Sequence, residues 1–329
     1  MSTEHRQRPG YIPEMQIARG IGILLVTIGH SEPIAVEFPF LFTLIYSFHM
    51  PLFFFMSGFF SQGLINSKWV RDILPRTARL YLPYLLISMV YAAIKLIFPA
   101  TVKRPVILEE LPVQLLLYPF DNPALFLWFL YILLLMKLLS PVFRGCRPVF
   151  LVPVFVVTAS WYGSIDLFGT WSLLKHLLYY TLGILLGSHR ALFRDFLKHS
   201  LLRWGAVPAF PLLYWFSHDL ENGLLPVATA LAGIWLTLVV SFFRFPEKIK
   251  SALETCGALS LEVYLLQYFF IFPVLSALST LGLPQPLIVP CTFLAGLLGP
   301  VVCTRLLLDR SPVLALLVSG RRMRSVQCE

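Results

Sequence analysis

Residues 15–31 read MQIARGIGILLVTIGHS, an apolar run with one arginine near its start and one histidine near its end. On an α-helix, Arg19 and His30 would point to the same face within about 20° and lie roughly 16 Å apart along the helix axis. One face of a single membrane-spanning helix would therefore carry a cation near one membrane surface and an imidazole well inside. Ionisable groups are costly at such depth and usually face a cavity in which they act.

The composition indicates a membrane protein. Hydrophobic residues make up 57% of the 329 residues and charged residues 13%, whereas soluble domains carry roughly 25% charged residues. The polar segment before residue 15 leads straight into a full-length span, so we expect no cleavable signal peptide. The net charge is +9. The positions of the basic residues along the chain indicate membrane topology rather than nucleic-acid binding.

Apolar runs of the ~20 residues that a transmembrane helix needs predict an all-α integral membrane protein with about ten helices in one bundle. They lie at 14–31, 38–62, 79–98, 123–141, 148–164, 171–188, 201–217, 224–243, 256–279 and 286–308. We expect three parts: a cytoplasmic N-terminal segment (1–13), the membrane domain (14–308) and a basic cytoplasmic tail (309–329).

The basic residues predict the orientation of the spans. With the N-terminus in the cytoplasm, all but four of the 26 Lys and Arg fall on the cytoplasmic side, the four being Lys95, Lys103, Arg104 and Lys175. This bias places both termini inside. The outer loops lean acidic, which either only avoids positive charge or offers polar groups to a hydroxyl-rich acceptor.

Two histidines are candidates for chemistry. His30 either caps the end of the first span at the membrane interface or acts as a general base, because imidazole titrates near the operating pH. His49 lies near mid-membrane, two residues before Pro51, which predicts a kinked helix. It is either a core histidine bonded to a neighbouring helix or part of a site.

The arginines are candidates for binding an anion. Arg19 either reaches lipid phosphates or holds a phosphate or pyrophosphate, and Gly20 and Gly22 leave room for a partner helix or a ligand. Arg76 and Arg79 are spaced to share a helical face on the same membrane side. They are either a positive-inside signal or, with Arg19, a cytosolic site for several phosphates.

Further polar residues stand inside or beside apolar runs. Glu262 needs a partner in the ninth span, and Arg19 or His49 has a suitable depth. Asp121-Asn122-Pro123 predicts a helix cap at the start of the fourth span. Trp128 belongs either to an interfacial aromatic belt or to a sugar-stacking surface.

The five cysteines lack the spacing of a metal site and are interpreted as small buried residues. They are Cys146, Cys256, Cys291, Cys303 and Cys328. We expect no metal site.

Several motifs together resemble acyltransferase family 3, the integral membrane O-acyltransferases, and more narrowly its fucose 4-O-acetylase-like branch. They are Arg19-Gly20 with ten residues between Arg19 and His30, FHMPLFFFMSGFF at 48–60, RTARLYLP at 76–83, LWFL at 127–130 and SLEVYLLQ at 260–267. The resemblance covers most of the chain.

The resemblance implies transfer of an acyl group, most often acetyl from cytosolic acetyl-CoA, to a sugar hydroxyl of a surface polysaccharide or its lipid-linked precursor. His30 would be the catalytic histidine, with His49 or Glu262 orienting or shielding the site. Arg19, Arg76 and Arg79 would bind the acyl-CoA. The enzyme would lie in the cytoplasmic membrane, with lipids and sugar but no nucleic acid as partners.

The chain departs from the family pattern at two positions. Gln16 replaces an acidic residue commonly found three positions before the arginine, and Gln267 replaces a histidine that commonly ends the ninth-span motif. A multi-span transporter or lipid-glycan flippase is an alternative, because buried Arg, His and Glu with Pro-kinked spans also suit transport. An inactive scaffold in a polysaccharide synthesis complex is a third interpretation.

Overall fold

The computed structural model describes residues 12–61, 64, 72–98, 104–143, 150–160, 166–220 and 223–321, and this part of the chain is helical without a strand. Six of its helical stretches are long and apolar enough to cross a membrane: Pro39–Phe59, Leu74–Ile97, Leu125–Phe143, Leu224–Ser241, Ser260–Thr280 and Gln285–Arg310. Each coincides with a predicted span, which confirms the helical membrane class. The other four spans, at 14–31, 148–164, 171–188 and 201–217, stay predictions.

Contacts divide the chain into two compact units, each built from separated stretches. The first unit comprises Met1–Met56 and Leu186–Cys303, and the second comprises Ser57–Leu185 and Thr304–Glu329. His30, His49, Arg19 and Glu262 belong to the first unit. The predicted anion-binding residues Arg76 and Arg79 belong to the second.

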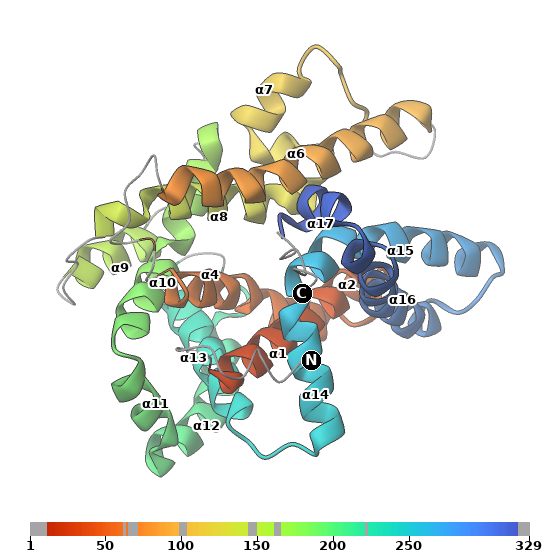
Figure 1. Ribbon diagram of the computed structural model, residues 1–329. Coiled ribbons are helices and arrows are strands. Elements are labelled where there is room, and N and C mark those ends of the chain that lie inside the picture. The colour runs from red at the N-terminus through yellow and green to blue at the C-terminus, as the bar shows by residue number, and fades with distance from the viewer. Residues whose placement is uncertain are drawn as a thin grey trace, which may run out of the picture. The chain divides into compact units, whose positions relative to one another are not determined.

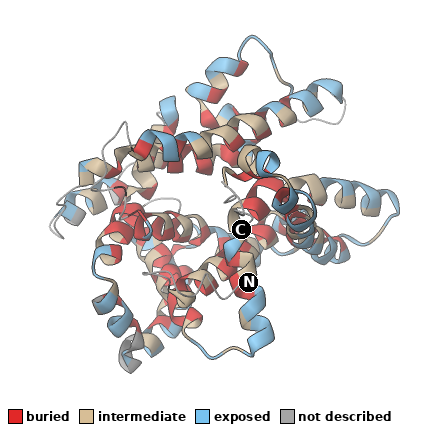
Figure 2. Ribbon diagram, in the orientation of Figure 1, coloured by how far each residue is buried: buried red, intermediate tan, exposed pale blue. Residues whose placement is uncertain are grey.

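The first unit is arranged around α1 (Pro13–Gly29), which runs beside α14 (Glu247–Ala258) and also packs on α13 (Leu224–Ser241) and α15 (Ser260–Thr280) (Figure 1). Its other helices are α2 (Ile34–Glu37), α3 (Pro39–Tyr46), most of α4 (His49–Phe59), α11 (Arg190–Lys198), α12 (Ser200–Ser217) and most of α16 (Gln285–Leu306). Buried residues follow α1 and α13, whereas the first turn of α14 and the far end of α15 are exposed (Figure 2).

Glycines bring α1 and α14 into backbone contact. A Cβ atom on Gly20 would strike the main-chain carbonyl of Leu253, and one on Gly257 would strike the carbonyl of Gln16. Gly22 is covered in turn by the side chains of Leu52 and Phe53 on α4. The space beside these small residues, which was predicted to admit a helix or a ligand, is therefore occupied by neighbouring helices.

Two predicted spans are interrupted. The second breaks at residues 47–48, between α3 and α4, so that Pro51 stands in the first turn of α4, where its missing N–H costs least. The helix is thus interrupted next to His49, where a kink was expected. The predicted ninth span, 256–279, includes the end of α14 and nearly all of α15, which are separated at Leu259.

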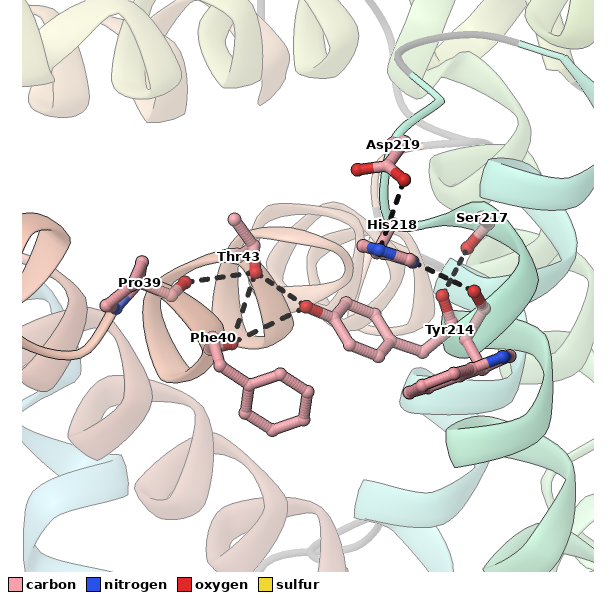
Figure 3. A network of polar contacts seen from close by, with 8 residues as sticks. Pro39, Phe40, Thr43, Tyr214, Ser217, His218 and Asp219 are labelled. Carbon is pink, nitrogen blue, oxygen red and sulfur yellow. Dashed lines mark hydrogen bonds and ion pairs between the residues drawn. The ribbon is translucent and has the colours of Figure 1, made fainter.

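A polar network joins α3 to α12 (Figure 3). The hydroxyls of Thr43 and Tyr214 lie 2.5 Å apart, and Thr43 also donates to the carbonyl of Phe40 at 3.1 Å. At the end of α12, His218 donates through Nδ1 to the carbonyl of Trp215 and pairs with Asp219 at 3.2 Å. None of the predicted site residues belongs to this network.

The second unit is built on α6 (Leu74–Ile97), which packs on α8 (Trp128–Leu139) and α17 (Pro312–Ser319). It also contains α7 (Leu111–Leu116), α9 (Leu151–Ser160), most of α10 (Thr170–Ser188) and the short 3-10 helices η4 (Pro119–Asp121), η5 (Leu125–Leu127), η6 (Ser140–Phe143), η8 (Leu167–Gly169) and η9 (Leu308–Arg310). α17 ends at Gly320, whose φ of 66° suits glycine and which packs on the main-chain carbonyl of Arg79.

The predicted cap at Asp121-Asn122-Pro123 was wrong, because α8 begins only at Trp128. Asn122 is used differently: its oxygen accepts from the N–H of Ala124 at 2.7 Å, and its amide donates to Ser88 on α6 at 2.8 Å. The side chain thus fixes a turn and a helix contact. Trp128 stacks on Phe120 with ring centroids 5.5 Å apart, and its predicted role stays open.

Candidate functional site

The candidate site begins where α1 ends. His30 caps this helix, and its main-chain N–H reaches the carbonyl of Val26 at 2.9 Å. Arg19 lies three turns earlier on the same helix, and both side chains are partly buried. A single helix and its C-terminal cap therefore carry both groups, as the sequence predicts.

The imidazole of His30 contacts α15 through two side chains. Nε2 of Gln267 lies 3.0 Å from Nδ1 of His30, and the ring of Tyr268 stacks on the imidazole with centroids 5.1 Å apart and planes inclined by 27°. Gln267 is fully buried. These contacts fix the plane of the His30 ring and the nitrogen that faces α15.

His49 approaches the same site from the start of α4. Its side chain is buried, and Tyr46, whose ring contacts His49, also lies against Gly29, the residue before His30. Nδ1 of His49 is 2.9 Å from the carbonyl of Ile45, and the ring of Tyr46 meets the imidazole edge-on at 4.6 Å. The break between α3 and α4 positions this histidine, because Ile45 lies just before the break and His49 just after it.

Two oppositely charged side chains, Arg19 and Glu262, lie on the same two helices as the His30–Gln267 contact. Glu262 on α15 is 2% exposed, and its carboxylate acts on the guanidinium of Arg19. Arg19 was one of the two partners expected for this carboxylate. Each charge offsets part of the cost of burying the other.

The two remaining predicted residues lie on α6. Arg76 is exposed and Arg79 is half-buried near the start of that helix, so their predicted placement on one helix is confirmed. Their grouping with Arg19 into a single anion site stays a prediction. Lys68 and Arg71, from the same predicted basic loop, lie outside the described residues, as do Cys146 and Cys328.

Gln267 and Tyr268 were not predicted as contacts of His30. The available signal was Gln267 itself, an amide within an apolar run at a position where a histidine was expected. Among the residues that the structure describes, no group of three or more His, Cys, Asp or Glu side chains is arranged to hold a metal ion.

These elements define a helical membrane protein in which α1, α4 and α15 carry two imidazoles, a buried amide, and the oppositely charged side chains of Arg19 and Glu262. The chain belongs to acyltransferase family 3, because that family's model, described as an acyltransferase domain, matches residues 12–305. It is therefore a membrane acyltransferase. No curated protein and no solved structure matched the chain. The narrower likeness to the fucose 4-O-acetylase-like branch stays a prediction.

Proposed function

We propose that this acyltransferase moves an acetyl group from cytosolic acetyl-CoA to a sugar hydroxyl of a surface polysaccharide or its lipid-linked precursor. The observation that carries the proposal is the contact of His30 with the buried amide of Gln267, near a second buried histidine, His49, in a member of an acyltransferase family. Acyl transfer to a hydroxyl requires removal of one proton, and imidazole suits that task at neutral pH.

The reaction balances without another reactant. The hydroxyl oxygen attacks the carbonyl carbon of the thioester, its O–H bond breaks, and a C–O ester bond forms. The C–S bond then breaks, and CoA leaves as a thiol that carries the displaced proton. An imidazole that takes the proton from the hydroxyl and returns it to the sulfur is therefore regenerated in each cycle.

The donor would bind through cations. CoA carries several phosphate oxygens, which a guanidinium can hold with two parallel hydrogen bonds. Arg19, Arg76 and Arg79 are the proposed ligands of these phosphates. Glu262 would hold the guanidinium of Arg19 in place, since its carboxylate acts on that charge.

The test measures free CoA released by the purified full-length protein from acetyl-labelled acetyl-CoA, with and without crude cell-surface glycan. We expect glycan-dependent release of CoA together with transfer of label to the glycan. Movement of a glycan across vesicles without consumption of acetyl-CoA would contradict the proposal and favour the transporter.

A further inference from the structure

The hydrogen bonds of Gln267 determine which nitrogen of His30 carries the proton. Nε2 of Gln267 lies 3.3 Å from the carbonyl of Tyr264 and 3.0 Å from Nδ1 of His30. A carbonyl only accepts, so its neighbour must be the NH₂ end of the amide. That end donates to Nδ1, which in the neutral ring leaves the proton on Nε2.

His49 has the opposite arrangement. Its Nδ1 lies 2.9 Å from the carbonyl of Ile45, which only accepts, so Nδ1 must carry the proton. In the neutral ring, Nε2 of His49 is then unprotonated and carries a lone pair. Tyr268 stacks on the His30 ring, whereas Tyr46 meets the His49 ring edge-on, with centroids 4.6 Å apart.

We propose that Gln267 and the Ile45 carbonyl hold the two imidazoles in opposite tautomers, which divides the catalytic work between them. His49 offers a lone pair at Nε2 and takes the proton of the acceptor hydroxyl. His30 offers an N–H at Nε2 and donates a hydrogen bond to the oxyanion that develops on the thioester carbonyl. This division rests on the proposed acyl transfer and differs from the expectation that His30 is the base.

The division satisfies the chemistry of the step. The proton leaves the hydroxyl oxygen, binds Nε2 of His49, and passes from there to the sulfur as the C–S bond breaks. His30 stays neutral throughout and only donates, as a neutral imidazole does when it polarises a carbonyl. Gln267 is a positioning residue, because it contacts His30 and acts through that ring.

The tautomers can be measured without any substrate. In full-length protein labelled with ¹⁵N-histidine, the two ring nitrogens of a neutral imidazole give distinct signals, assigned here by their loss in His30→Gln and His49→Gln. We expect His30 to be protonated on Nε2 and His49 on Nδ1. Protonation of His30 on Nδ1, or the same tautomer in both rings, would overturn the proposal even if no acyl transfer is detected.

Gln267→Glu supplies a matched perturbation. A carboxylate accepts rather than donates, so we expect it to move the His30 proton to Nδ1 while His49 keeps its tautomer. Gln114→Glu, on α7 of the second unit, introduces the same change of charge and should leave both rings as in the wild type. An unchanged His30 signal in Gln267→Glu would show that Gln267 does not set the tautomer.

Measurements of transfer activity then distinguish a histidine that donates a hydrogen bond from one that acts as a base. A glutamine amide can donate to an oxyanion but cannot take a proton at neutral pH. We expect His30→Gln to retain at least ~10-fold more kcat than His30→Ala, and His49→Gln to be as inactive as His49→Ala. The reverse ranking would overturn the division of roles, whereas absence of transfer in the wild type would overturn only the proposed function and leave the tautomers to the ¹⁵N measurement.

Discussion

Gly20 of α1 lies directly against the main-chain carbonyl of Leu253 on α14, so that a methyl group at this position would overlap the carbonyl oxygen. We predict that Gly20→Ala lowers stability by about 1–3 kcal/mol, the usual cost of forcing extra atoms into a packed contact. The melting temperature of the purified protein in detergent should fall, because α1 and α14 must separate.

Gly205 on α12 is the matched control. A Cβ atom there would meet nothing within 4 Å, and alanine favours helix over glycine by roughly 0.5–1 kcal/mol. Gly205→Ala should therefore leave the melting temperature unchanged or raise it. Equal losses in both variants would show that close packing of α1 on α14 is not the cause.

Glu262→Gln should destabilise the protein strongly, although it changes the shape of the side chain very little. The amide keeps the shape of the side chain but leaves Arg19 without the opposite charge that now acts on it. Removal of one member of a buried pair costs roughly 3–5 kcal/mol, and because Arg19 is only partly buried we expect about 3 kcal/mol. Chemical denaturation in detergent measures the change in unfolding free energy.

Glu247→Gln is the control for the loss of a surface carboxylate. Glu247 pairs with Lys250 at 3.5 Å, and its side chain is 82% exposed. An exposed pair of this kind contributes about 0–1 kcal/mol. If Glu262→Gln proved no worse than this control, the Arg19–Glu262 interaction would not stabilise the first unit.

Arg79→Ala should weaken binding of the acyl donor. Loss of a hydrogen bond between a guanidinium and a phosphate costs about 1.5–3 kcal/mol, which corresponds to roughly a 10- to 100-fold increase in KM for acetyl-CoA. Lys248→Ala removes an exposed cation from α14 and should leave KM unchanged. A similar KM in all three proteins would remove Arg79 from the proposed donor site.

Tyr180→Phe should destabilise the second unit. The buried hydroxyl of Tyr180 lies 2.7 Å from that of Ser140 and donates to that of Ser61 at 3.0 Å. Its loss should cost about 1 kcal/mol, since both serines keep a main-chain acceptor. Tyr46→Phe loses only a 3.5 Å contact with the carbonyl of Gly29, so thermal unfolding should show a smaller change for that variant.

The sequence was most informative about the features that a membrane environment requires of the chain. Long apolar runs predict spans because hydrocarbon leaves few alternatives, and six of them appear as helices of sufficient length. Arg19 and His30 could be assigned to one helix because both lie in a single apolar run. An irregularity beside His49 was expected from Pro51, which cannot donate a main-chain hydrogen bond, and the helix is interrupted at residues 47–48.

The pairing of helices could not be read from one chain. Nothing in residues 260–267 indicates that Gln267 reaches His30, because that contact depends on the rotation of α15 against α1. Similarly, Asn122 is a residue type that favours helix caps, but its amide donates to Ser88 instead. The sequence around Asn122 does not indicate this partner, because Ser88 lies 34 residues earlier in the chain. The amide at Gln267 was visible only as a departure from a family pattern, although it contacts the candidate histidine.

The central claim is acyl transfer at the His30 site, and the most direct measurement follows label from acetyl-CoA into glycan in three purified proteins: wild type, His30→Ala and His218→Ala. His218 is an exposed histidine at the end of α12, so it controls for the loss of an imidazole. We predict transfer by the wild type and His218→Ala, and a loss of at least ~100-fold in His30→Ala with an unchanged melting profile. Wild-type transfer by His30→Ala would contradict the account.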